Sequence, residues 1–80
     1  MPKIIVYGAD WCHMTRAALE LLRRRKIDFK YIDIDRNPQA AEWVARQNGG
    51  KEKKPTIDID GVILSEPTDR ELEEALQSAR

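Results

Sequence analysis

The chain has 80 residues, of which 41% are hydrophobic, and its 14 basic side chains (Lys plus Arg) balance 14 acidic ones (Asp plus Glu). This length suits one small domain, and the zero net charge gives no overall attraction to nucleic acid or to anionic lipid. The single cysteine excludes a disulfide within the chain, and we expect no metal site because a cluster of His and Cys is absent. The apolar runs are too short for a secretory or membrane-spanning segment, so we expect a soluble cytoplasmic protein.

The first half of the chain predicts a strand, a helix and a second strand. Segment 3–7 is rich in Ile and Val and ends at Gly8, which is typical of a buried strand that enters a loop. From residue 13 to about residue 25, apolar side chains recur at spacings of three and four, which indicates an amphipathic helix; these side chains are Met14, Ala17, Ala18, Leu21 and Leu22. Segment 29–35 then alternates apolar and charged residues and predicts a strand, which completes a βαβ unit.

A second helix is predicted to begin at Asn37-Pro38. Asparagine accepts hydrogen bonds from the free amides of a helix N-terminus, and proline suits the first turn. The small apolar side chains that follow can pack inward, and Asn48-Gly49-Gly50 ends the helix.

The rest of the chain predicts a β-hairpin and a last helix. Two short apolar segments, 56–59 and 62–64, flank Asp60-Gly61, which is a strong signal for a two-residue hairpin turn. The last helix opens at Thr68 or the following residue, where the spacing predicts a capping box. The order βαβ then αββα can close into one four-stranded mixed sheet with flanking helices. We therefore predict one α/β domain with the thioredoxin fold over residues 1–80.

Cys12 lies where the first strand gives way to the first helix, in a loop that also carries Trp11. The free N–H groups and the dipole of a helix N-terminus favour negative charge, so they favour the thiolate over the thiol. Such sites lower the pKa of a cysteine below its free value of about 8.5, and the thiolate is the nucleophile. Arg16 and His13 can add positive potential, whereas Asp10 opposes it. We predict Cys12 as a catalytic nucleophile; the alternative is a small buried hydrophobic residue.

A resemblance to glutaredoxins, and to their actinobacterial relatives the mycoredoxins, is carried by the segment Tyr7-Gly8-Ala9-Asp10-Trp11-Cys12-His13-Met14-Thr15. It implies thiol-disulfide oxidoreductase activity, with glutathione or another low-molecular-weight thiol as co-substrate and no tightly bound cofactor. A C-x-x-C or C-x-x-S pair is usual in the family, and Thr15 takes the place of the resolving thiol here. The resemblance therefore implies a monothiol mechanism in which Cys12 reduces glutathionylated or otherwise S-thiolated proteins.

Two further segments carry the resemblance. Lys54-Pro55 precedes a predicted strand, as the family's cis-proline does, so the resemblance implies a cis Pro55 and a backbone at Lys54 that pairs with the bound thiol. Segment 65–69 stands where glutaredoxins grip the γ-glutamyl end of glutathione, and Asp69 is its aspartate. The family's glycines are absent there, and segment 60–67 is closer to mycoredoxins. The predicted substrate-binding residues are Trp11, His13, Thr15, Arg16, Lys54, Pro55 and Asp69.

Three other functions remain open at this point. Cys12 of two chains and two glutathione thiols could hold an iron–sulfur cluster, as in monothiol relatives. Segment 12–16 also resembles the Cys-x-x-Ser-Arg segment of thioredoxin-fold arsenate reductases. The third alternative is an inactive member that serves as an interaction module. We expect a monomer; a disulfide-bridged or cluster-bridged dimer is the alternative.

Overall fold

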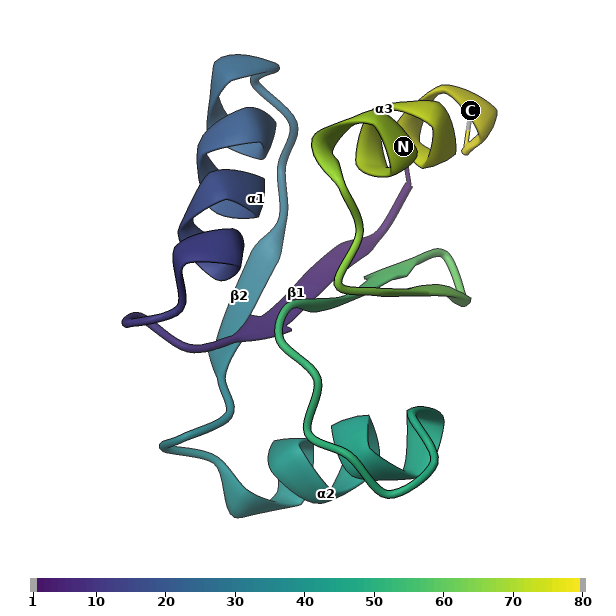
Figure 1. Cartoon of the computed structure of the whole chain (residues 1–80). Helices are drawn as coiled ribbons and strands as arrows, with labels where there is room; N and C mark the ends of the chain where they lie inside the picture. Colours follow the sequence, from purple (N-terminus) through teal and green to yellow (C-terminus); the bar gives the residue numbers. More distant parts are fainter. Residues whose placement is uncertain (1, 80) are drawn as a thin grey trace.

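Four strands and three helices follow one another in the computed structural model, which describes residues 2–79 (Figure 1). The elements are β1 (Ile4–Gly8), α1 (His13–Arg24), β2 (Lys30–Asp33), α2 (Pro38–Gln47), β3 (Thr56–Ile59), β4 (Val62–Ser65) and α3 (Asp69–Ser78). This is the predicted order of elements. None of the described helices combines the length and the apolar composition needed to cross a bilayer.

The strands form one mixed sheet in the order β2-β1-β3-β4. β1 runs parallel to β2 and antiparallel to β3, and Val6 lies opposite Tyr31 on one side and Ile57 on the other. β3 and β4 form the predicted hairpin, in which Asp60 and Gly61 both have positive φ, as a tight two-residue turn requires. The predicted four-stranded mixed sheet is therefore confirmed.

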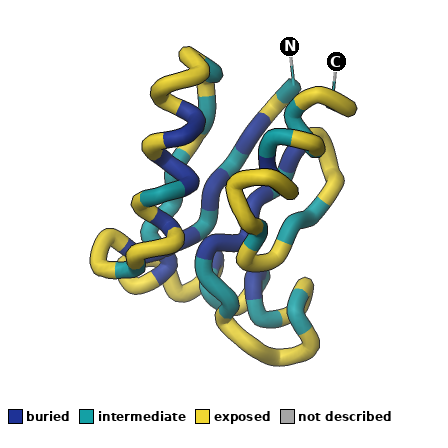
Figure 2. The backbone as a smooth tube through the Cα atoms, turned by 45° about the horizontal axis from the view of Figure 1, so that its top comes forward, coloured by how far each residue is buried: buried dark blue, intermediate teal, exposed yellow. Residues whose placement is uncertain are grey.

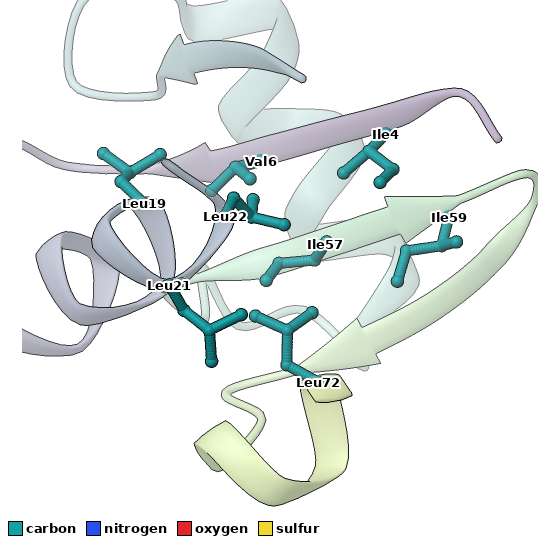
Figure 3. Packing of buried hydrophobic residues seen from close by; sticks show 9 residues of the cluster. Ile4, Val6, Leu19, Leu21, Leu22, Ile57, Ile59 and Leu72 are labelled. Atoms are coloured by element: carbon teal, nitrogen blue, oxygen red, sulfur yellow. The ribbon is translucent and has the colours of Figure 1, made fainter. Parts of the chain in front are cut away.

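The sheet separates two hydrophobic clusters. α1 and α3 lie on one face and α2 on the other (Figure 1). On the first face, Val6 and Ile57 of the two central strands pack with Leu22 of α1 and Leu72 of α3 (Figure 3). The cluster beneath α2 is smaller and centres on Ile34, Ala40 and Val44. Figure 2 shows the buried positions concentrated along the strands and on the inner sides of the helices.

Two helix starts have the expected caps. The side chain of Asn37 accepts a hydrogen bond from the amide of Ala40, with Pro38 in the first turn of α2. Thr68 and Glu71 form a capping box at α3, in which each side chain accepts from the other's backbone amide. These contacts satisfy amides that have no partner within the helix.

The first turn of α1 differs from the predicted pattern. Met14, expected to face inward, is 41% exposed, whereas Thr15 is fully buried. The side chain of Thr15 faces inward and packs against Gly8, where an added Cβ would lie 2.5 Å from side-chain atoms of Thr15. The absent side chain of Gly8 therefore leaves the space that Thr15 fills.

β2 is also shorter than the segment 29–35 predicted as a strand. It ends at Asp33 because the chain turns there: Asp33 accepts from the amides of Asp35 and Arg36. Ile34 keeps one backbone bond to β1, through Gly8, while its side chain enters the cluster beneath α2. This turn brings Asp35 to the flank of the loop that carries Cys12.

Candidate active site

Cys12 occupies the N-cap position of α1. Its amide donates to the carbonyl of Ala9 at 3.0 Å, and its carbonyl accepts from the amide of Arg16 at 3.1 Å. The first turn contains no acidic residue, and the cysteine is partly exposed. The sulfur therefore lies at the positive end of the helix dipole and within reach of solvent.

Thr15 supports the thiol from the protein interior. It is fully buried, and its hydroxyl oxygen accepts from the amide of Ala9 at 3.4 Å. Because that oxygen already has a donor, the hydroxyl proton is free to point toward Cys12. Thr15 lies inside the protein and not on its surface, and its contact with a substrate stays a prediction.

The pKa of the Cys12 thiol is lowered. Partial burial raises the pKa, but the hydroxyl of Thr15, the amides of Thr15 and Met14, and the charge of Lys54 together outweigh burial. The expected direction of the shift is confirmed, with helix amides among its causes. The positive charge comes from Lys54, whereas the sequence pointed to Arg16 and His13.

The loop before β3 brings a second backbone segment to the sulfur. The Lys54-Pro55 peptide bond is cis, as predicted. The carbonyl of Lys54 lies 3.8 Å from Sγ of Cys12 and accepts a weak hydrogen bond from the thiol. Pro55 is buried beneath this contact, so its ring shapes the loop from inside.

A set of hydrogen bonds holds the cis-proline loop. The hydroxyl of Thr56 donates to the carbonyl of Lys53 at 2.8 Å and accepts from Nδ2 of Asn48 at 3.2 Å. Oδ1 of Asn48 in turn accepts from the hydroxyl of Ser65 on β4. The sequence indicated Asn48 only as the end of a helix; its role as a brace depends on segments that meet only in the folded chain.

Trp11 lies beside Cys12 and is 65% exposed, yet both its ring and its N–H are engaged. Nε1 donates to Oδ2 of Asp35 at 2.6 Å, and the ammonium of Lys54 lies 5.4 Å from the ring centroid. Next to it, the hydroxyl of Tyr31 donates to Oδ1 of Asp10 at 2.7 Å. Sequence reasoning missed Asp35, which it assigned only to a strand.

The remaining predicted binding residues lie on the surface. His13 and Arg16 are exposed on the first turns of α1, and Asp69 is exposed in the first turn of α3. Within residues 2–79, no side-chain hydrogen bond or ion pair joins them to Cys12, so their contact with a substrate stays a prediction. The same residues include no group of three or more His, Cys, Asp or Glu side chains that could hold a metal ion.

The amino-acid sequence of the chain is similar to those of known proteins. A sequence model of the glutaredoxin family matches residues 4–64. Mycoredoxin 1 of Corynebacterium glutamicum is 34% identical over 68 residues, which cover 84% of each chain.

Solved structures agree with the sequence comparison. A glutaredoxin from Methanosarcina mazei is 30% identical, with a TM-score of 0.76 over 92% of this chain and 77% of that one. A glutaredoxin from Archaeoglobus fulgidus is 23% identical and superimposes with a TM-score of 0.83 over 96% of this chain and 88% of that one. The likeness confirms the predicted thioredoxin fold.

Proposed function

Because the chain belongs to the glutaredoxin family of thiol-disulfide oxidoreductases, we propose that it reduces mixed disulfides between a protein and a small thiol through Cys12 alone. The observation that carries the proposal is the site of Cys12, a partly exposed thiol of lowered pKa at the N-cap of α1. A thiolate at that site is ready to attack a disulfide sulfur. We place the reaction in the cytoplasm, where free thiols persist.

The proposed reaction has two exchange steps. The Cys12 thiolate attacks the small thiol's sulfur in the mixed disulfide, and the protein thiolate leaves and takes up a proton. Cys12 is then joined to the small thiol by a new disulfide bond. A second small thiol, as its thiolate, attacks that bond and forms the oxidised small-thiol dimer, which regenerates the Cys12 thiolate. The net reaction converts one protein mixed disulfide and one small thiol into a protein thiol and one small-molecule disulfide.

The residue at position 15 supports the monothiol form of this reaction. Cys12 is the single cysteine of the chain, and the buried hydroxyl of Thr15 stands where the family usually has its second thiol. A hydroxyl cannot attack the Cys12 mixed disulfide, so release requires an external thiol. The same hydroxyl favours the Cys12 thiolate, so it favours the attacking form of the enzyme.

The small thiol is proposed to be glutathione or another low-molecular-weight thiol. The cis Lys54-Pro55 bond holds the Lys54 backbone beside the sulfur, where it can pair with the peptide-like part of a bound thiol. The ammonium of Lys54 over Trp11 adds positive charge on the same side, which suits a carboxylate. Family relatives include both a glutaredoxin and a mycoredoxin, so both glutathione and other small thiols belong in the test.

The test is turnover of a mixed disulfide. Hydroxyethyl disulfide should be reduced at the expense of glutathione, coupled to glutathione reductase, by the unmodified chain and not by Cys12→Ser. Thermal unfolding of both proteins controls for loss of the fold. Equal turnover in Cys12→Ser would refute the proposal and favour an interaction module. A chain that turns over with another small thiol but not with glutathione would support the reaction and correct the co-substrate.

A matched variant tests the monothiol part. Thr15→Cys restores a second thiol at the position that the family usually fills with cysteine. We expect this variant to gain reduction of protein disulfides such as those of insulin, while the unmodified chain reduces them poorly. Equal insulin reduction by the two proteins would contradict the role given to Thr15.

A further inference from the structure

Three carboxylates gather beside the Cys12 loop, and the proposed reaction uses none of them. They belong to Asp10, Asp33 and Asp35, whose negative charges act on the hydroxyl of Tyr31. Burial raises the pKa of Tyr31, and so do the hydrogen bond and negative charge of Asp10 and the charges of the other two carboxylates. Negative charge at this place should oppose a thiolate at Cys12, yet the pKa of Cys12 is lowered.

Each carboxylate is occupied by a donor. Asp10 accepts from the hydroxyl of Tyr31, and Asp33 accepts from the amide of Asp35 and pairs with Arg36 at 3.6 Å. The carboxylate of Asp35 accepts from the indole N–H of Trp11 at 2.6 Å, which is a short, charge-assisted hydrogen bond. Of the three, Asp35 is the one whose side chain bonds to the side chain of Trp11, the residue next to Cys12.

The indole connects Asp35 to a cation. The ammonium of Lys54 lies over the ring of Trp11, 5.4 Å from the ring centroid and within the range of a cation–π contact. A carboxylate bonded to the indole N–H pushes electron density into the ring, and this strengthens the attraction for a cation. Lys54 is also the residue whose carbonyl touches Cys12 and whose charge lowers the pKa of the thiol.

We propose that Asp35 is a positioning residue of the active site: its carboxylate fixes the Trp11 indole, and the indole holds the Lys54 ammonium beside Cys12. The ammonium of Lys54 also donates to the carbonyl of Glu52 at 3.3 Å, so this side chain has two restraints. Loss of the indole contact would widen the range of rotamers that the side chain samples in solvent. The negatively charged Asp35 thus stabilises the positively charged Lys54 near the nucleophile. The importance of Asp35 for catalysis rests on the proposed function. The arrangement of Asp35, Trp11 and Lys54 rests on their contacts alone.

The neighbourhood of the thiol contains other charges that an experiment must hold constant. They come from the β1–α1 loop, from α1, from the end of β2 and from the cis-proline loop, and they are Asp10, His13, Arg16, Asp33, Lys53 and Lys54. A substitution of Asp35 removes a negative charge, which by itself would favour the thiolate. The proposed support acts in the opposite direction, so the sign of the change separates the two effects.

Two variants of equal charge give the test. Asp35→Asn keeps a side-chain oxygen that can accept from the indole, whereas Asp35→Ala has none. The readout is the rate of Cys12 alkylation by iodoacetamide as a function of pH, because it follows the thiolate fraction. We expect the rate at pH 6 to be about threefold lower in Asp35→Ala than in Asp35→Asn, as loss of an exposed cation–π contact implies. Equal pH profiles for the two variants would overturn the proposal.

A double-mutant cycle shows whether the effect passes through Lys54. Lys54→Gln should lower alkylation at pH 6 by about threefold in the Asp35→Asn background and have a clearly smaller effect in the Asp35→Ala background. Additive effects would mean that Asp35 does not act through Lys54 and would also overturn the proposal. Thermal unfolding and the NMR signal of the Trp11 indole N–H, which should shift further in Asp35→Ala than in Asp35→Asn, separate a loss of fold from a loss of this bond.

Alkylation requires no glutathione and no turnover. A chain that fails to reduce mixed disulfides but shows the predicted alkylation profiles would refute the proposed function and leave the role of Asp35 intact. A chain that turns over normally with equal profiles for the two Asp35 variants would do the reverse.

Discussion

Removal of one hydroxyl tests how the thiolate of Cys12 is stabilised. Thr15→Val replaces the hydroxyl with a methyl group and keeps the β-branched shape of a fully buried side chain. The change removes the donor to the Cys12 sulfur and also leaves the amide of Ala9 without its acceptor at 3.4 Å. The packing against Gly8 is retained, so the fold should survive with a loss of about 1 kcal/mol in the free energy of unfolding.

The size of the effect follows from the hydrogen bond that is lost. A hydrogen bond to a charged group contributes about 1.5–3 kcal/mol, and the partial exposure of Cys12 points to the lower end of that range. This predicts about a tenfold lower thiolate fraction in Thr15→Val at a pH below both pKa values. Because a more basic thiolate is a better nucleophile, the plateau rate at high pH should rise by about threefold.

Iodoacetamide alkylation over a range of pH measures both quantities. The midpoint of the profile should move to higher pH in Thr15→Val while its plateau rises, and Thr15→Ser, which keeps the hydroxyl, should stay close to the unmodified chain. An unchanged midpoint in Thr15→Val would refute the reasoning, because the helix amides and Lys54 would then suffice.

Three further predictions concern stability. Gly8→Ala should lower the free energy of unfolding by about 1–3 kcal/mol in chemical denaturation, since its Cβ would overlap the branched side chain of Thr15; an unchanged stability would contradict this close contact. Leu72→Ala should cost about 2–5 kcal/mol because Leu72 is the buried side chain of α3, while Leu76→Ala should cost less; equal costs would contradict the packing. Folding lowers the pKa of Cys12, so the unfolded chain binds more protons and stability should rise with pH from the folded pKa up to the free value of about 8.5. That contribution is lost as the pH falls through the folded pKa, and Cys12→Ser should remove it; an identical pH dependence in Cys12→Ser would contradict the shift.

The order of elements could be predicted because short local signals mark their ends. Asn37-Pro38 and Asp60-Gly61 act through their own backbone preferences, and the structure places a helix start and a hairpin turn at them. The inner face of α1 was predicted less well. Periodicity favoured Met14 because it is apolar, but the space left by Gly8 across the loop admits Thr15 instead. The pattern of apolar residues along one helix carries no information about Gly8, which lies outside that helix.

The site was predictable where it depends on local chain position. Cys12 at a helix start and Pro55 before a strand were both found, and the cis bond was confirmed. The partners that hold the site come from distant segments: Trp11 and Asp35 are 24 residues apart, and no spacing rule links them. The role of Asn48 in holding the cis-proline loop was likewise not predictable, because its contact with Thr56 forms only when α2 and β3 have come together.

Transfer of the small thiol between two proteins tests the central claim most directly. The reduced chain would be mixed with an S-glutathionylated protein, and the intact masses of both followed by mass spectrometry before and after addition of glutathione. The account predicts that glutathione moves from the substrate protein to Cys12 and is then removed by the added thiol. A disulfide between the two proteins, or no transfer at all, would contradict a monothiol reaction at Cys12.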